Sequence, residues 1–94
     1  MSDRTLKSNI TTISDALNKV VSLRGVEFDW IESGGHGIGV IAQEVEEVIP
    51  EVVLTHMGLK SVAYGNLIAV LIEAIKDQNK RIKLLEALVE RFVK

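Results

Sequence analysis

The chain has no cysteine, a single proline and only four aromatic residues: two phenylalanines, one tryptophan and one tyrosine. Without cysteine it can form no disulfide, no thiolate metal site and no cysteine nucleophile. Hydrophobic residues make up 47% of the chain and aromatic residues 4%, so any core must be mainly aliphatic. No apolar run approaches the roughly 20 residues of a membrane span. The two histidines have no partner at ligand spacing, so we expect no metal and no cofactor.

Charge gives little indication of a partner, because 11 basic and 13 acidic residues leave a net charge of -2. The basic residues are spread along the chain, which indicates neither a nucleic-acid partner nor an anionic membrane. Met1 leads into charged residues, so we expect no signal peptide. A length of 94 residues limits the chain to one small domain, which we place at 1–94.

The first apolar pattern predicts a helix over residues 12–23. Thr12 and Asp15 have the spacing of a capping box, and Arg24 and Gly25 are typical of a helix end. The residues expected on its apolar side are Ile13, Leu17, Val20 and Val21.

Residues 26–62 predict two antiparallel hairpins separated by a short helix. In the first strand, Val26, Phe28 and Trp30 alternate with acidic residues, as in a half-buried strand. The expected elements are strands at 26–30 and 38–42 joined by the glycine-rich 33–37, a helix at 43–49 ended by Pro50, and a hairpin at 51–62 with Gly58 in its loop.

From about Gly65 no helix breaker occurs, which predicts a helical stem at 65–94 behind a body at 1–64. Eight of its residues are spaced alternately three and four apart and form a heptad seam: Ile68, Leu71, Ile75, Gln78, Ile82, Leu85, Val89 and Phe92. Apolar residues beside the seam suit three strands, or a helix that packs on its own body as well as on partners. A single amphipathic helix in a monomer is the alternative. The expected fold class is α+β, a small body of short antiparallel strands and helices followed by a long helix in a trimeric coiled coil.

Ser2 and Lys7 are a candidate nucleophile and base, although polar N-termini are also ordinary. Five residues apart, they face different ways on a helix or a strand. Either the segment bends, or Ser2 meets Lys7 of a neighbouring chain. Attack on the carbonyl of the preceding residue closes a five-membered ring, so the bond cut would be the one before Ser2. We expect Asp3 to orient Arg4 or cap a turn, because beside Lys7 it would favour the charged amine.

Other polar residues suggest weaker hypotheses. His36, in the glycine-rich connection, is either a helper in the cut or a solvated histidine, and His56 is expected to be exposed. Glu44, Glu46 and Glu47 are interpreted as the solvated face of a helix.

Four blocks of the chain occur in a distinctive order: SDRTLKSNI at 2–10, LRGVEFDW at 23–30, GIGVIAQEVEEVIPEVV at 37–53 and KSVAYGNLIAVLIEAIK at 60–76. Together they resemble the C-terminal intramolecular chaperone domain of bacteriophage endosialidases, tail spikes and tail fibres, over essentially the whole chain. This resemblance implies a homotrimer that aligns an upstream β-rich stalk for folding and then cuts itself off. It also implies a serine–lysine dyad in a Ser-Asp-x-x-x-Lys motif, which falls on Ser2, Asp3 and Lys7.

The resemblance thus favours a single-turnover autoproteolytic serine endopeptidase without a cofactor, made in the bacterial cytoplasm as part of a phage tail protein and released after cleavage. Its partners would be two further copies and its own upstream stalk, with no nucleic acid and no membrane. The chain as given would be the released product with a start methionine. The rival hypothesis is a non-catalytic coiled-coil oligomerisation or adaptor module, which leaves the Ser2–Lys7 pairing unexplained.

Overall fold

The fold consists of two small hairpins and short helices at one end of a long helix. The structure is a computed structural model that describes residues 1–93. The elements are η1 (Arg4–Leu6), α1 (Ala16–Val21), β1 (Val26–Asp29), β2 (His36–Gly39), α2 (Ala42–Val48), η2 (Pro50–Val52), β3 (Val53–His56), β4 (Leu59–Val62) and α3 (Tyr64–Val93). The predicted α+β class is confirmed.

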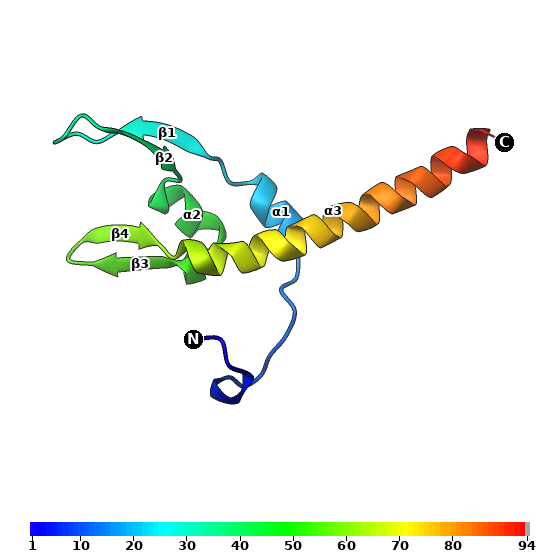
Figure 1. The fold of residues 1–94 in the computed structure, drawn as a ribbon, viewed down its shortest axis with the longest axis horizontal. Coiled ribbons are helices and arrows are strands. Elements are labelled where there is room, and N and C mark those ends of the chain that lie inside the picture. The colour runs from blue at the N-terminus through cyan, green and yellow to red at the C-terminus, as the bar shows by residue number, and fades with distance from the viewer. Residues whose placement is uncertain (94) are drawn as a thin grey trace.

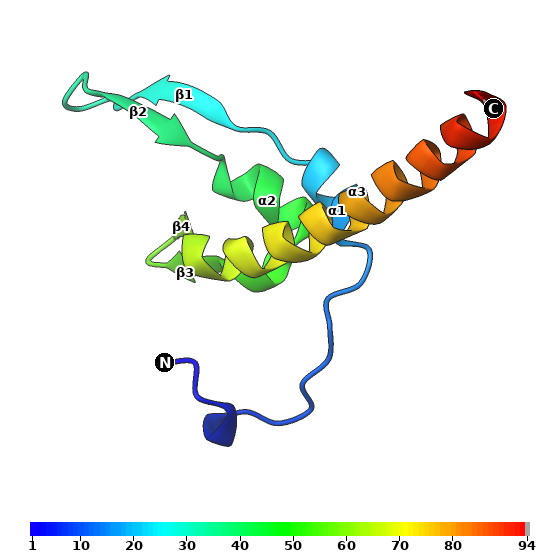
Figure 2. The same cartoon turned by 45° about the vertical axis from the view of Figure 1, so that its right-hand side comes forward.

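The molecule is elongated, measuring 61 × 40 × 21 Å. Residues 13–62, here called the packed body, gather around the first part of α3; both hairpins extend past its start, and its C-terminal part extends beyond the body on the other side (Figure 1). The N-terminal segment, residues 1–12, stands away from the packed body on the side opposite the β1–β2 hairpin. Figure 2 shows the same separation from a second direction.

The core is small and aliphatic, as the composition predicts. Ala16 of α1 is fully buried where α1 packs against α3, and Val45 of α2 is almost fully buried. Within residues 1–93, the buried side chains are Ala16, Val45, Ile49, Val52, Leu67, Val70 and Ala74. Three of these lie on α3, so one face of the long helix completes the core of its own chain.

The predicted start of α1 at a Thr12 capping box is wrong. Asp15 adopts a left-handed conformation with φ of 58°, and its side chain makes no capping hydrogen bond to the backbone. This conformation turns the chain so that Ala16 enters the core, and the helix therefore begins at Ala16. Val21, expected on the apolar side, is exposed. Arg24 binds Glu44 of α2 through two hydrogen bonds of 2.8 and 2.9 Å.

Both hairpins are antiparallel, and each is a separate two-stranded sheet. β1 ends at Asp29 and β2 begins at His36, so the connection is residues 30–35, and His36, expected within it, is a strand residue. In the second hairpin, β3 extends to His56, and Met57 and Gly58 have φ of 51° and 78°. Positive φ at both central residues is typical of a type I′ turn, which suits the twist of a two-residue hairpin.

The first hairpin closely approaches the start of α3. The amide of Val40 donates a hydrogen bond to the hydroxyl of Tyr64 at 3.4 Å. A Cβ atom at Gly39 would lie 2.7 Å from the same hydroxyl, so a larger residue there would force the Tyr64 ring to move.

The long helix α3 presents two apolar faces. Leu67, Val70 and Ala74 are buried in the packed body. The heptad seam lies on another face, where its apolar side chains are exposed by fractions between 39% for Leu71 and 89% for Phe92. No helix within residues 1–93 combines the length and apolar character required to cross a membrane.

Candidate active site

Ser2 and Lys7 lie on either side of the single turn of 3-10 helix η1. Within this turn, Leu6 N donates to Asp3 O at 3.2 Å and Lys7 N donates to Arg4 O at 3.1 Å. The turn reverses the chain, so that Lys7 Nζ donates a hydrogen bond to Ser2 Oγ at 3.0 Å. This contact joins two residues of the same chain, which is one of the two arrangements that the spacing leaves open.

Asp3 is the N-cap of this turn. Its Oδ1 accepts hydrogen bonds from Thr5 N at 2.8 Å and from Thr5 Oγ1 at 2.6 Å. These bonds, the one from the Thr5 hydroxyl foremost, lower the pKa of the Asp3 carboxyl. Among the hydrogen bonds of residues 1–93, none joins Asp3 to Lys7. The expectation that Asp3 caps a turn is confirmed, and Thr5 is a neighbour of the pair that sequence analysis missed.

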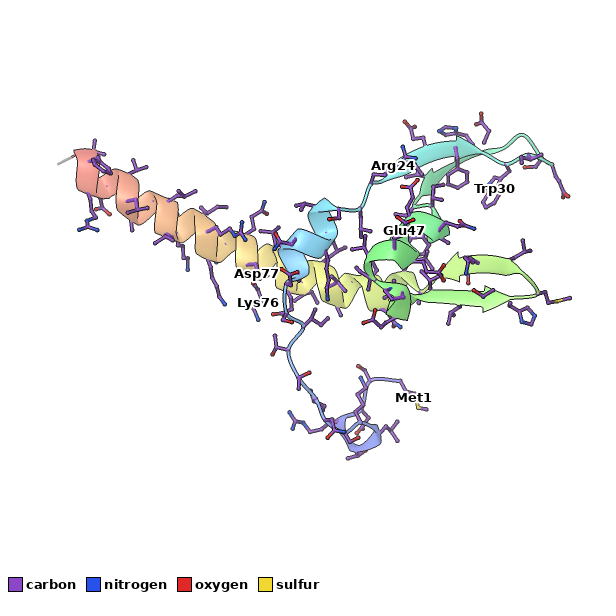
Figure 3. The ribbon with its side chains drawn as sticks, turned by 180° about the vertical axis from the view of Figure 1, so that it is seen from behind. Met1, Arg24, Trp30, Glu47, Lys76 and Asp77 are labelled. Carbon is purple, nitrogen blue, oxygen red and sulfur yellow. The ribbon has the colours of Figure 1, made fainter. Side chains whose placement is uncertain are left out.

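The turn is surrounded by water in the single chain. Leu6 and Ile10, which could have formed apolar walls around Lys7, are exposed by 63% and 60%. Figure 3 shows Met1 beside the turn and well apart from Arg24, Glu47 and Trp30 of the packed body. Ser2 and Lys7 are therefore held together by hydrogen bonds within the turn and not by a pocket shielded from solvent.

His36 is held in place on β2. Its Nδ1 lies 2.9 Å from Asp29 Oδ1, and its Nε2 lies 3.1 Å from Glu27 Oε1. Both carboxylates, Asp29 foremost, raise the pKa of His36. Because β2 and η1 lie on opposite sides of the molecule, the structure does not bring His36 to Ser2 within one chain (Figures 1 and 2).

Two of the three carboxylates of α2 form surface ion pairs. Glu44 binds Arg24, and Glu46 accepts a hydrogen bond from Lys60 at 2.9 Å. Glu47 and His56 are exposed, as expected. Across residues 1–93, no three histidine or carboxylate side chains gather in an arrangement that could hold a metal ion.

Comparison with known proteins identifies the family. Residues 2–54 match peptidase family S74, described as "Chaperone of endosialidase". The chain belongs to this family. The match begins at Ser2 and includes Asp3, Lys7 and the first hairpin, and it confirms the resemblance drawn from the sequence. Membership of a peptidase family of this description implies autoproteolysis.

The relatives of this S74 domain include proteins of phage tails. The domain is 40% identical over 96 residues to the long tail fiber protein Gp37 of Enterobacteria phage K3, and equally identical to Gp37 of Enterobacteria phage T2. These alignments cover 92% of this chain but only 8% and 7% of the two fibre proteins. The chain thus spans less than a tenth of the length of these relatives.

An open apolar groove of about 1120 Å³ lies between the two hairpins of the S74 domain. Phe28, Trp30, Ile31 and Leu59 contribute to its lining. The rings of Phe28 and Trp30 meet edge to face, with their centroids 4.9 Å apart. Neither Ser2 nor Lys7 lines the groove, so it is separate from the candidate active site.

Proposed function

We propose that this S74 domain is a homotrimeric intramolecular chaperone of a phage tail spike or tail fibre. It aligns three copies of an upstream β-rich stalk and then releases itself by cutting the peptide bond before Ser2. The family supports the chaperone role. The observation that best supports the mechanism is the 3.0 Å contact between Lys7 Nζ and Ser2 Oγ.

The reaction begins when neutral Lys7 accepts the hydroxyl proton of Ser2. Ser2 Oγ attacks the carbonyl carbon of the preceding residue through a five-membered ring. In this chain that carbonyl belongs to Met1. The C–N bond then breaks, and the Ser2 nitrogen takes the proton from Lys7 and becomes a free amine, leaving an ester on Oγ. Water hydrolyses the ester, which gives the carboxylate of the upstream segment and restores the Ser2 hydroxyl.

Lysine acts as a base only after it loses its proton, and removal from water favours the neutral amine. In the single chain the turn is exposed, so we expect the assembled trimer to cover it. The exposed apolar side chains of the seam supply the driving force for association, because assembly removes them from water. In this scheme the cut depends on assembly, and a chain does not separate from its stalk before the three copies have aligned.

The rival, a non-catalytic coiled-coil module, accounts for the seam equally well. It gives no reason for a serine and a lysine to meet across a tight turn at the first residue of the family match. The two functions predict different outcomes for a precursor kept without added protease: the chaperone should cut itself before Ser2, and the non-catalytic module should stay intact.

The test is a precursor in which the stalk sequence encoded ahead of Ser2 is present, expressed without added protease. We expect two fragments, the smaller beginning at Ser2 by mass spectrometry. Ser2→Ala, Lys7→Ala and Lys7→Arg should each leave the precursor intact, since arginine keeps its proton and cannot act as the base. Lys83→Ala, which removes an exposed lysine of α3, is the matched control and should be cut normally. Cutting before residue 2 in the Ser2→Ala precursor would exclude the mechanism.

A further inference from the structure

Within residues 1–93, the turn that joins Ser2 to Lys7 makes hydrogen bonds only within itself. Among the hydrogen bonds of residues 1–93, none links the N-terminal segment to the packed body. The backbone of η1 contributes two bonds, of 3.1 and 3.2 Å. A single 3-10 turn of this kind has poor hydrogen-bond geometry, and short helical pieces are marginal without packing.

The geometry of the pair depends on this turn. Five residues of extended chain span up to about 17 Å, far more than the reach needed for a hydrogen bond between Ser2 and Lys7. If the turn opens, the lysine loses its fixed position relative to the hydroxyl. A hydrogen bond that keeps η1 closed therefore holds the Ser2 and Lys7 side chains in position without contacting either of them.

The shortest bonds in the turn come from Thr5. Its hydroxyl and its amide converge on one oxygen, Asp3 Oδ1, at 2.6 and 2.8 Å. Hydrogen bonds to an ionised carboxylate are shorter and stronger than those between neutral groups. These two bonds tie residue 3 to residue 5 and fix the point where the chain reverses.

We infer that Thr5 is a positioning residue for the Ser2–Lys7 pair: it holds Asp3 in the turn and thereby keeps Lys7 Nζ beside Ser2 Oγ. The inference rests on the proposed autoproteolysis. It assigns Asp3 a geometric role, in which its carboxylate binds Thr5 and does not act on Lys7 through its charge. An asparagine at position 3 can accept the same two hydrogen bonds, because asparagine is as good an N-cap as aspartate.

The test compares cleavage rates of assembled precursors. Thr5→Val keeps the shape of the side chain but removes the hydroxyl, and we expect cleavage to slow at least about tenfold, as for the loss of one charge-assisted hydrogen bond in a turn that the assembled trimer covers. Thr5→Ser keeps the hydroxyl and should restore the rate to within about twofold. Thr11→Val, at an exposed threonine outside the turn, is the control and should cleave at the unaltered rate.

Two further measurements separate positioning from other roles. The trimer should still form in Thr5→Val by sedimentation equilibrium, because within residues 1–93 no hydrogen bond joins the turn to the packed body, and the turn lies outside the seam. Asp3→Asn should cleave within about threefold of the unaltered rate with the same pH profile, whereas Asp3→Ala, which has no acceptor, should be slow.

Several outcomes would overturn the inference. They are unaltered cleavage in Thr5→Val, failure of Thr5→Ser to restore the rate, loss of the trimer in Thr5→Val, and a shifted pH profile in Asp3→Asn. Each leaves the proposed autoproteolysis intact if Ser2→Ala and Lys7→Ala remain uncut. Cleavage in those two precursors would instead contradict the proposed function itself.

Discussion

In this domain, the local geometry of the backbone determines which side chains form hydrogen bonds with one another. Lys7 reaches Ser2 because a tight turn separates them, and His36 reaches Asp29 because the two residues lie directly opposite each other in the β1–β2 register. Glu27 lies two residues before Asp29 on the same face of the strand, where it meets the other nitrogen of the imidazole ring.

The histidine between two carboxylates should respond to pH. The pKa of His36 is raised above its usual 6.5, chiefly by Asp29. Below pH 6.5 the protonated His36 ring contributes fully to the stability of the hairpin. This contribution is lost as the pH rises through the raised pKa that His36 has in the folded hairpin. We expect an NMR titration of His36 to give a pKa above 6.5, and Asp29→Asn to lower it more than Glu27→Gln does.

Glu32→Gln removes an exposed carboxylate from the loop of the same hairpin and serves as the control, with little effect on the titration of His36. A pKa of His36 at its ordinary value, unmoved by Asp29→Asn, would show that the two contacts do not persist in solution.

Some of these residue-level features could be read from the sequence and others could not. The motif singles out Ser2, Asp3 and Lys7, but their spacing suits neither a helix nor a strand, so it does not say which copy of Lys7 reaches Ser2. Thr5 was accessible in principle, since Asp-x-Thr is typical of a side-chain-capped turn. The contacts of His36 were not accessible, because the glycines around it conceal where β2 begins.

At the scale of elements, strong periodicity predicted structure well and local capping signals did not. The long helix was expected from about Gly65 and begins at Tyr64, and the second hairpin has Gly58 in its turn as expected. The predicted start of α1 was wrong: Asp15 is left-handed without a capping hydrogen bond, and the helix begins at Ala16, which is fully buried against α3. Contacts between distant segments decide such boundaries.

The two faces of α3 lead to a prediction about assembly. The face with Leu67, Val70 and Ala74 is buried within its own chain, so we expect the exposed seam to form the contact between copies. Sedimentation equilibrium should show a trimer. Ile75→Glu and Ile82→Glu should each shift it to monomer, because three unpaired charges would meet at the axis.

Leu84→Glu is the matched control, since Leu84 is equally apolar, lies on α3 and is 63% exposed, but falls outside the seam. It should remain trimeric. A monomer at micromolar concentration in the unaltered protein, or dissociation by Leu84→Glu alone, would contradict a seam through Ile75 and Ile82.

At the scale of the whole molecule, the turn and the stem lie in different parts of an elongated chain, so the proposed cutting and the expected assembly depend on different residues (Figure 1). The packed body could be predicted as a set of short elements, whereas the separation of the N-terminal segment from it could not. The sequence of residues 1–12 contains no pattern that predicts their position outside the packed body. Variants of the turn should therefore leave the trimer intact, and variants of the seam should abolish cutting together with assembly.

Since Lys7 meets Ser2 across a turn of its own chain, each copy should carry a complete pair. The decisive measurement is cleavage in mixed trimers formed by co-expressing Ser2→Ala and Lys7→Ala precursors with different tags. We expect no cleavage of either chain. In mixtures of unaltered and Ser2→Ala precursors, only the unaltered chains should be cleaved. Cleavage of the Lys7→Ala chain in the mixed trimers would show that a neighbour supplies the lysine and would contradict a pair contained within one copy.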